Sequence, residues 1–235
     1  MSEQGRRIDR KIVLSAPAGD DTVPSALRPQ GNDFDFSVIN RPREMSRDED
    51  LALLREYTHS ESLIRHMLAV EAAMRAYARR FGEDEETWGR VGLLHDFDYE
   101  RWPDPPDHPL KGAEILESRG YPAEVIYAIK SHADYLPDCP RVSLMDKALY
   151  ACDELAGFIT ACALVRPNRL EGMTPKSVRK KMKTPTFAAA VNRDDIVRGA
   201  EDLGVDLNEH IAFVIAAMQN VAAELGLATD LTESE

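Results

Sequence analysis

Residues 61–81 read ESLIRHMLAVEAAMRAYARRF and are followed directly by Gly82. Apolar side chains recur in this stretch at spacings of three and four residues, which is the period of an amphipathic helix. A glycine immediately after the last periodic residue is typical of a helix end, because glycine readily adopts the left-handed backbone conformation found there. The stretch therefore predicts a long helix with an apolar face.

The same helical pattern continues on both sides of this stretch. Ser46 and Glu49 have the spacing of a capping box, which favours a helix that begins there and runs to about Tyr57. Further helices are expected at 84–95, 110–119, 122–133 and 143–165, and from Thr174, Asn192 and Asp206 onward. Strands have almost no support in the sequence, apart from one short stretch near Lys11–Leu14.

These patterns predict an all-α fold, organised as a single-domain helical bundle over residues 46–227. Residues 1–45 combine several prolines with Gly, Asp, Ser and Arg and hold no sustained period, so we expect a flexible N-terminal extension. Residues 228–235 read as a polar C-terminal tail.

The charge balance of the chain argues against some classes of binding partner. Lys and Arg number 29 against 41 Asp and Glu, which gives a net charge of -12. Proteins that bind a nucleic-acid duplex or an anionic membrane need basic surface, so neither partner is expected. No apolar run approaches the ~18–20 residues of a membrane span. The three cysteines form no CxxC pair, which is typical of free thiols in a reducing cytoplasm.

Several imidazoles and carboxylates fall on apolar helix faces. His66 lies four residues before Val70, His95 lies seven after Trp88 with Asp96 beside it, and similar positions hold His132 and Asp153. Any one of these histidines could be an ordinary hydrogen-bonded core residue. Two buried carboxylates with several imidazoles satisfy each other poorly without a cation, however, and a divalent metal removes that conflict.

These residues, in this order on helices, resemble the HD superfamily of metal-dependent phosphohydrolases. The resemblance runs from about residue 60 to 166 and includes the phrases His108-Pro109-Leu110-Lys111-Gly112 and Ile129-Lys130-Ser131-His132. It implies a helical bundle of the HD-domain type. It also implies that one metal is bound by His66, His95, Asp96 and Asp153.

The resemblance further implies that His108 and His132 match the additional histidines of binuclear members, in which Asp96 bridges two ions. We therefore expect one or two divalent ions, with Mn, Mg, Fe, Ni, Co and Zn not distinguished. In a mononuclear site, His108 and His132 would instead bind phosphate or act as acids.

The sequence after the His95-Asp96 pair departs from the family. Nucleotidase members carry a glutamate three residues after the aspartate, where this chain has Tyr99. This difference favours metal-activated water as the nucleophile, with Asp96 as a catalytic residue. Asp98 is a candidate for proton handling, although it could equally be a loop or capping residue.

A phosphate substrate needs cationic side chains besides metal. Lys111 is a catalytic and substrate-binding candidate because it follows His108 by about one turn, and Lys147 and Arg166 are further substrate-binding candidates. A basic run at 176–183 is either a solvated helix face or a lid.

The favoured function is hydrolysis of a phosphomonoester or phosphodiester of a nucleotide or similar small metabolite. A di-iron oxygenase of the same superfamily and a non-catalytic, metal-stabilised ligand-binding protein are the alternatives. A small phosphorylated substrate is the expected partner, a homo-oligomer is compatible with the sequence, and a cytoplasmic location is expected.

Overall fold

The computed structural model describes residues 45–229, which belong to one compact unit. The predicted extension up to residue 44, with its short strand, and residues 230–235 of the predicted tail lie outside the described residues.

Every secondary-structure element within residues 45–229 is a helix, which confirms the predicted all-α class. The helices are α1 (Arg47–Tyr57), α2 (Glu61–Phe81), α3 (Glu85–Leu94), α4 (Asp107–Ser118), α5 (Ala123–Ser131), α6 (Leu144–Leu164), α7 (Pro175–Met182), α8 (Arg193–Leu203) and α9 (Leu207–Asn220). The capping box at Ser46 and the left-handed cap at Gly82, with φ of 74°, are formed as expected.

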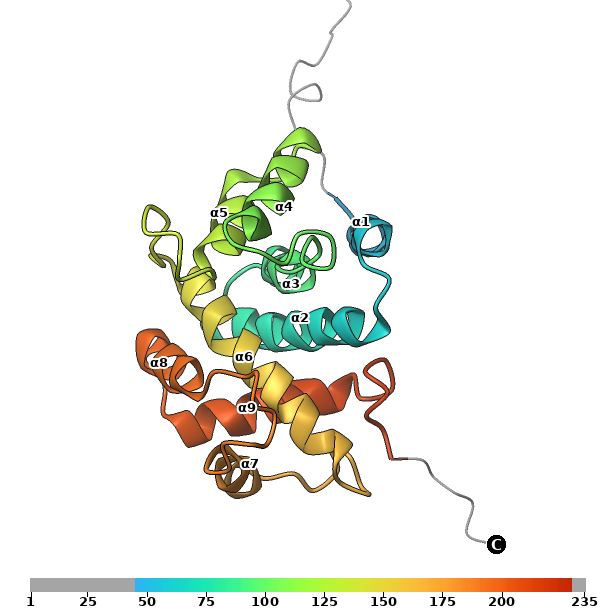
Figure 1. Ribbon diagram of the computed structural model, residues 1–235, viewed down its shortest axis with the longest axis vertical. Helices are drawn as coiled ribbons and strands as arrows, with labels where there is room; N and C mark the ends of the chain where they lie inside the picture. Colours follow the sequence, from blue (N-terminus) through green and yellow to red (C-terminus); the bar gives the residue numbers. More distant parts are fainter. Residues whose placement is uncertain (1–44, 230–235) are drawn as a thin grey trace, which may run out of the picture. The chain divides into compact units, whose positions relative to one another are not determined.

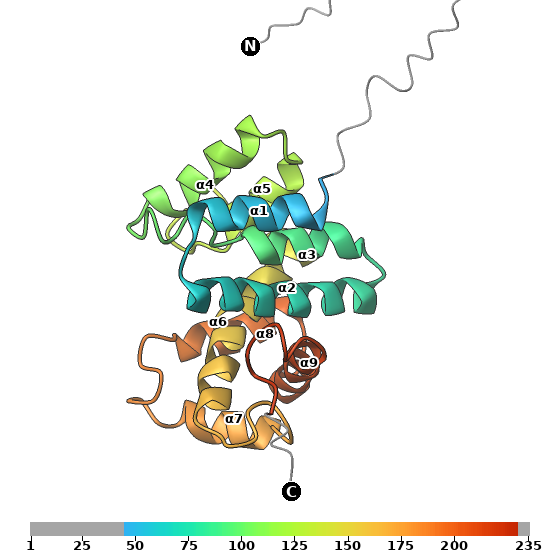
Figure 2. The ribbon, with the colours of Figure 1, turned by 90° about the vertical axis from the view of Figure 1, so that its right-hand side faces the viewer.

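Helix α2 lies between two groups of helices (Figure 1). Helices α1, α3, α4 and α5 lie on one side of it and α6 to α9 on the other, as the turned view also shows (Figure 2). This position explains its composition, because Met67, Val70, Met74 and Tyr77 are all fully buried and alanines fill the remaining contact surfaces. Small side chains let neighbouring backbones approach closely on more than one face.

Helix α4 departs from the expected boundary. It begins at Asp107, but His108 and Pro109 have non-helical backbone angles, and the regular part starts at Leu110 as the sequence predicts. The irregular turn carries His108 out of the helical periodicity and lets its side chain be placed independently of the helix face.

The three cysteines are free and buried. No helix within residues 45–229 is both long enough and apolar enough to cross a bilayer.

His210 on α9 is fully buried among groups that hold it neutral. Its Nε2–H donates to the Ala151 carbonyl at 2.8 Å, and its Nδ1 lies 2.6 Å from the Tyr77 hydroxyl, which therefore donates to it. Burial is the main cause that lowers the pKa of His210 to about 4. The unfolded chain takes up this proton at a higher pH, near 6.5, than the folded chain does.

We expect this difference to make the free energy of unfolding fall as pH drops from 6.5 to 4. The loss from His210 alone is at most about 3 kcal/mol, from 1.36 kcal/mol per pKa unit. Urea unfolding of the wild type and of His210→Gln at pH 7 and pH 4 measures it, since the glutamine has no proton to gain. Equal losses in both proteins would contradict the prediction.

Candidate metal centre

Three separate helices bring four of the predicted ligands together. His66 comes from the first turns of α2, His95 and Asp96 follow the end of α3, and Asp153 lies in the middle of α6. The His66 Nε2 lies 3.0 Å from Asp153 Oδ1 and 3.9 Å from Asp96 Oδ2. The His95 Nε2 lies 3.4 Å from Asp96 Oδ2 and 3.5 Å from Asp153 Oδ1. One ligand atom from each residue therefore faces a common point, and these four atoms lie within 4.8 Å of one another.

A second set shares Asp96 with the first. The Nε2 atoms of His108 and His132 lie 3.2 Å and 3.4 Å from Asp96 Oδ1 and 3.3 Å from each other. His108 comes from the irregular start of α4, and His132 follows the end of α5. The two carboxylate oxygens of Asp96 thus point to different sets, with Oδ2 toward His66 and His95 and Oδ1 toward His108 and His132. A carboxylate that bridges two ions has this arrangement.

The histidine tautomers suit metal binding. The Nδ1 of His95 lies 2.9 Å from the Gly92 carbonyl oxygen, and that of His132 lies 2.5 Å from the Ile129 carbonyl oxygen. A carbonyl oxygen only accepts, so each Nδ1 must carry the proton and donate it. The Nε2 lone pairs are then left facing the carboxylates, and such contacts orient metal-binding histidines in general.

The residues of the two sets are suited to bind a metal cation. His95 has no exposed surface, and its Nε2 finds no hydrogen-bond partner although it lies between two carboxylates. A buried polar nitrogen without a partner is costly. Ligand atoms on a shared ion with bonds of ~2.1 Å lie about 3.0–3.4 Å apart, close to most of the separations found here. A divalent ion in each set would satisfy this nitrogen and offset the carboxylate charge.

The electrostatics of the cluster favour positive charge. Burial opposes the charge on His95, but the Asp96 and Asp153 carboxylates raise its pKa well above the ordinary value. Burial likewise opposes the charge on His108, and the hydrogen bonds to Asp96 and Asp98 raise its pKa to about 9. Burial alone would raise the pKa of Asp96, yet His95, His108 and His132 hold it well below its usual range. The same negative potential that retains protons attracts a metal cation.

Asp98 does not face the cavity but is fully buried behind His108. Its Oδ1 accepts the Nδ1–H of His108 at 2.9 Å, and its Oδ2 accepts the backbone N–H of Gly112 at 2.8 Å. This position shows Asp98 as a partner of His108, and its role in proton handling stays a prediction. Both of its oxygens are used to orient His108 and to tie the cluster to α4.

We expect Asp98→Asn to weaken metal binding at the His108–His132 set by about 10- to 100-fold, the usual effect of losing such an orienting partner. The set around His66 does not contact Asp98 and should keep its ion. Metal analysis after dialysis should therefore move from two ions per chain toward one, while Asp104→Asn, at an exposed carboxylate of the nearby loop, leaves two. Two tightly held ions in Asp98→Asn would contradict the orienting role.

The three predicted cationic residues are not brought to the cluster. Lys111 is partly exposed and pairs with the exposed Glu114 at 3.1 Å. Arg166 donates to the carbonyl oxygens of Arg169 and Glu171 after the end of α6. Lys147 lines a different cavity, beside Arg141. Long basic side chains pair with the nearest acceptors, so their sequence positions alone do not decide where the charges lie.

The predicted basic run at 176–183 lies on and just after α7, and none of its side chains lines the cavity beside the cluster.

A cavity of about 390 Å³ opens beside both ligand sets, and we refer to it as the metal cavity. The sequence reasoning missed five of its polar wall residues, namely Asp134, Tyr135, Tyr150, Glu154 and Asp195. The sequence held a signal for two of these residues. Glu154 directly follows the candidate ligand Asp153, and Tyr135 follows His132 by three residues. Burial first, and then the charge of Asp153, raises the pKa of Glu154 to about 7.

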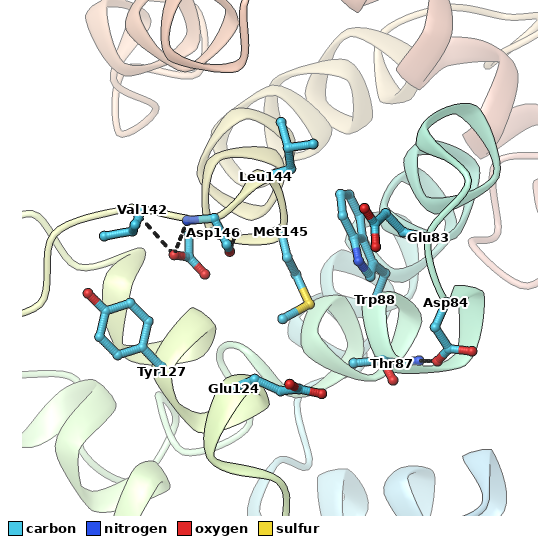
Figure 3. A pocket seen from close by; sticks show the side chains of 11 residues that line it. Glu83, Asp84, Thr87, Trp88, Glu124, Tyr127, Val142, Leu144, Met145 and Asp146 are labelled. Atoms are coloured by element: carbon cyan, nitrogen blue, oxygen red, sulfur yellow. Dashed lines mark hydrogen bonds between the residues drawn. The ribbon is translucent and has the colours of Figure 1, made fainter.

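A second cavity, of about 590 Å³, is lined by residues at the N-terminal ends of α3, α5 and α6 (Figure 3). The ligand candidates His95 and His132 instead follow the C-terminal ends of α3 and α5. Met145 and Trp88 lie along it, with the carboxylates of Glu83 and Glu124 at its sides. No histidine or cysteine lines it, and no metal-binding group found within residues 45–229 includes its residues. The possible metal-binding groups therefore border the smaller metal cavity and not this one.

Comparison with known proteins agrees with the geometry. The family model of the HD domain matches residues 63–157, an interval that holds all six residues of the two sets. The chain contains an HD domain. The similarity inferred from the sequence is thus confirmed, and the six ligand candidates that the fold brings together all lie within the matched residues.

Among curated proteins, this chain is similar to Ribonuclease Y of Desulfotalea psychrophila (strain LSv54 / DSM 12343). It is 30% identical over 104 residues, which make up 43% of this chain but only 19% of the relative. The chain therefore matches about a fifth of that protein's length. No solved structure gave a significant match.

Proposed function

We propose that this protein is a metal-dependent phosphohydrolase that cleaves a phosphomonoester or phosphodiester of a nucleotide or similar small metabolite. The observation that carries the proposal is the position of Asp96, whose two oxygens face two different histidine sets. Two ions that share one carboxylate are suited to hold the attacking and leaving oxygens of a phosphoryl transfer. The HD domain over residues 63–157 supports the same class of reaction.

Some residues of the site would hold the metal ions, and others orient the histidines that hold them. His66, His95 and Asp153 would hold one ion, and His108 and His132 the other, with Asp96 between them. Asp98 and the Gly92 and Ile129 carbonyls fix the imidazole rings. A divalent metal there supplies Lewis-acid polarisation of a phosphoryl oxygen and lowers the pKa of a coordinated water. Sets this rich in imidazole suit Fe, Ni or Zn better than Mg or Mn.

A small substrate fits better than RNA, although the curated relative is named a ribonuclease. RNA-binding proteins follow the phosphate backbone with basic side chains. Among the described residues no Lys or Arg lines the metal cavity, and the whole chain carries a net charge of -12. The volume of about 390 Å³ suits a small metabolite.

The test is hydrolysis by the full chain loaded separately with Mn²⁺, Fe²⁺, Co²⁺, Ni²⁺ and Zn²⁺. We expect turnover of p-nitrophenyl phosphate or bis-p-nitrophenyl phosphate that chelation abolishes and metal restores. A protein that binds two ions per chain but hydrolyses none of a broad panel of phosphate esters would sink the proposal. Faster cleavage of RNA than of any small ester would correct the substrate class.

The di-iron oxygenase is the second candidate, because four of the six ligand candidates are imidazoles, which suit iron. Iron retained after anaerobic purification, with oxygen consumption and no ester hydrolysis, would favour this reaction instead.

A further inference from the structure

The walls of the metal cavity carry an unusual charge for a phosphate site. Besides the ligands Asp96 and Asp153, three more carboxylates line it, from Asp134, Glu154 and Asp195. Among the described residues, no lysine or arginine lines it. Apart from the metal end, the charged side chains that line the cavity are therefore all carboxylates.

Two of these carboxylates already have cationic partners outside the cavity lining. Asp134 accepts from Arg141 at 2.5 Å, and Asp134 and Asp195 both accept from Arg198. The Tyr150 hydroxyl also donates to Asp195 at 2.8 Å. The charges on Asp134 and Asp195 are thus offset within the protein and need no ligand.

Glu154 is different. Among the described residues, Glu154 accepts one hydrogen bond, from the backbone N–H of Asn192 at 3.2 Å, and no Lys or Arg forms an ion pair with it. It is partly buried and follows Asp153 directly, so it has a second negative charge beside it. A partly buried carboxylate in this position is stabilised by a positive group from outside the protein.

Two exposed tyrosines stand on the same cavity. Tyr99 is 40% exposed and Tyr135 is 43% exposed, although both are held against His108. The Tyr99 ring meets the His108 imidazole edge to face at 5.2 Å, and the Tyr135 hydroxyl donates to the His108 carbonyl at 2.5 Å. The rings are therefore fixed while much of their surface stays open. Aromatic faces attract cations, and they do so together with carboxylates in ammonium sites.

We propose that the metal cavity selects a small phosphate ester that carries a positively charged ammonium group, with Glu154 as its acceptor and Tyr99 and Tyr135 as aromatic walls. This inference rests on the proposed phosphohydrolase function and names its substrate class. The phosphate group of the substrate binds at the end of the cavity where the two ligand sets lie. Its ammonium group binds between Glu154 and the two tyrosines. Nucleoside di- and triphosphates and RNA carry additional negative charge, which the Glu154 carboxylate repels.

The experiment compares 2-aminoethyl phosphate with propyl phosphate on the full-length, metal-loaded protein. The two esters have nearly the same shape and differ by an ammonium in place of a methyl group. We expect kcat/KM to favour 2-aminoethyl phosphate by about tenfold or more, equivalent to about 1.4 kcal/mol. In Glu154→Gln this ratio should fall close to one. Glu114→Gln, at an exposed glutamate paired with Lys111, should keep the wild-type ratio.

Calorimetric binding of the same two esters gives a readout that does not need turnover. Tighter binding of the aminoethyl ester without hydrolysis would support the ammonium site and overturn the phosphohydrolase function. Hydrolysis of both esters at equal rates would overturn the ammonium site and leave the phosphohydrolase function intact.

Three other results would also overturn the ammonium site. The first is an unchanged ratio in Glu154→Gln. The second is faster turnover of nucleoside monophosphates than of the aminoethyl ester. The third is the binding of three metal ions per chain, one of which is lost in Glu154→Gln. Glu154 would then bind a metal ion and not the ammonium group of a substrate.

Discussion

Asp96→Asn is expected to abolish binding of at least one of two metal ions and to lower phosphate ester hydrolysis by roughly 10³-fold, or about 4 kcal/mol of barrier. Asp96 is the residue whose two oxygens face both histidine sets, at 3.4 Å from His95 and 3.2 Å from His108. Asparagine keeps the shape but removes the negative charge, and its NH₂ group cannot bind a cation. One of the two sets therefore loses the oxygen that Asp96 supplies, whichever way the amide turns.

Metal analysis after dialysis and steady-state kinetics on the ester that the wild type hydrolyses best measure this effect. Asp104→Asn removes a carboxylate from the loop before α4, where the side chain is exposed, and should behave as the wild type. Circular dichroism should show an unchanged helical content in both proteins. If Asp96→Asn kept two tightly bound ions, the shared-carboxylate geometry would be wrong.

Gly92→Ala is expected to destabilise the fold by about 3 kcal/mol, the upper range for a side chain forced into a packed core. A Cβ added at Gly92 would lie 2.9 Å from the Glu71 Cα, the Glu71 nitrogen and the Val70 carbonyl carbon. All three are backbone atoms of α2, so no side-chain rotation relieves the contact and the two helices must move apart. The gain in helix propensity from alanine, about 1 kcal/mol, is too small to compensate.

Thermal unfolding measures this loss, and at this chain length we expect the Tm to fall by about 6–12 °C. Gly157→Ala is the matched control, because its Cβ would meet only the His66 ring, at 3.8 Å, in ordinary contact. The control should keep or slightly raise the Tm. Since α2 carries His66 and α3 leads into His95, Gly92→Ala should also weaken metal binding. An unchanged Tm would mean that α2 and α3 tolerate a wider separation than the structure has.

Much of the helical framework could be predicted from local sequence. The capping box at Ser46, the glycine after Phe81 and the apolar period of residues 61–81 act over a few neighbouring residues, so they can be read without knowing the fold. The exception is the start of α4, where the His108-Pro109 step interrupts the regular backbone angles.

The cationic residues show where local reasoning fails. Lys111 follows His108 by three residues, and the sequence placed its ammonium in the same cavity. The structure instead pairs Lys111 with Glu114, one turn further along α4. A long flexible side chain has many rotamers, and the acceptor that it reaches depends on the whole surface around it.

The ligand set was recognisable from sequence because its chemistry is unusual. Imidazoles and carboxylates on apolar helix faces conflict with burial unless a cation joins them, and that argument needs only helical periodicity and residue type. Their order along the chain was enough to indicate the HD superfamily. By itself, the sequence therefore determined the helical class, the family and the candidate ligands.

Only the tertiary structure decided which way the side chains of those residues point and which residues they contact. It turned one oxygen of Asp96 toward His66 and His95 and the other toward His108 and His132. It also buried Asp98 behind His108 and placed Glu154 on a cavity wall that no described cation lines. The physical reason is that the direction of a side chain depends on how helices distant in sequence pack together, and periodicity within one helix carries no information about its neighbours.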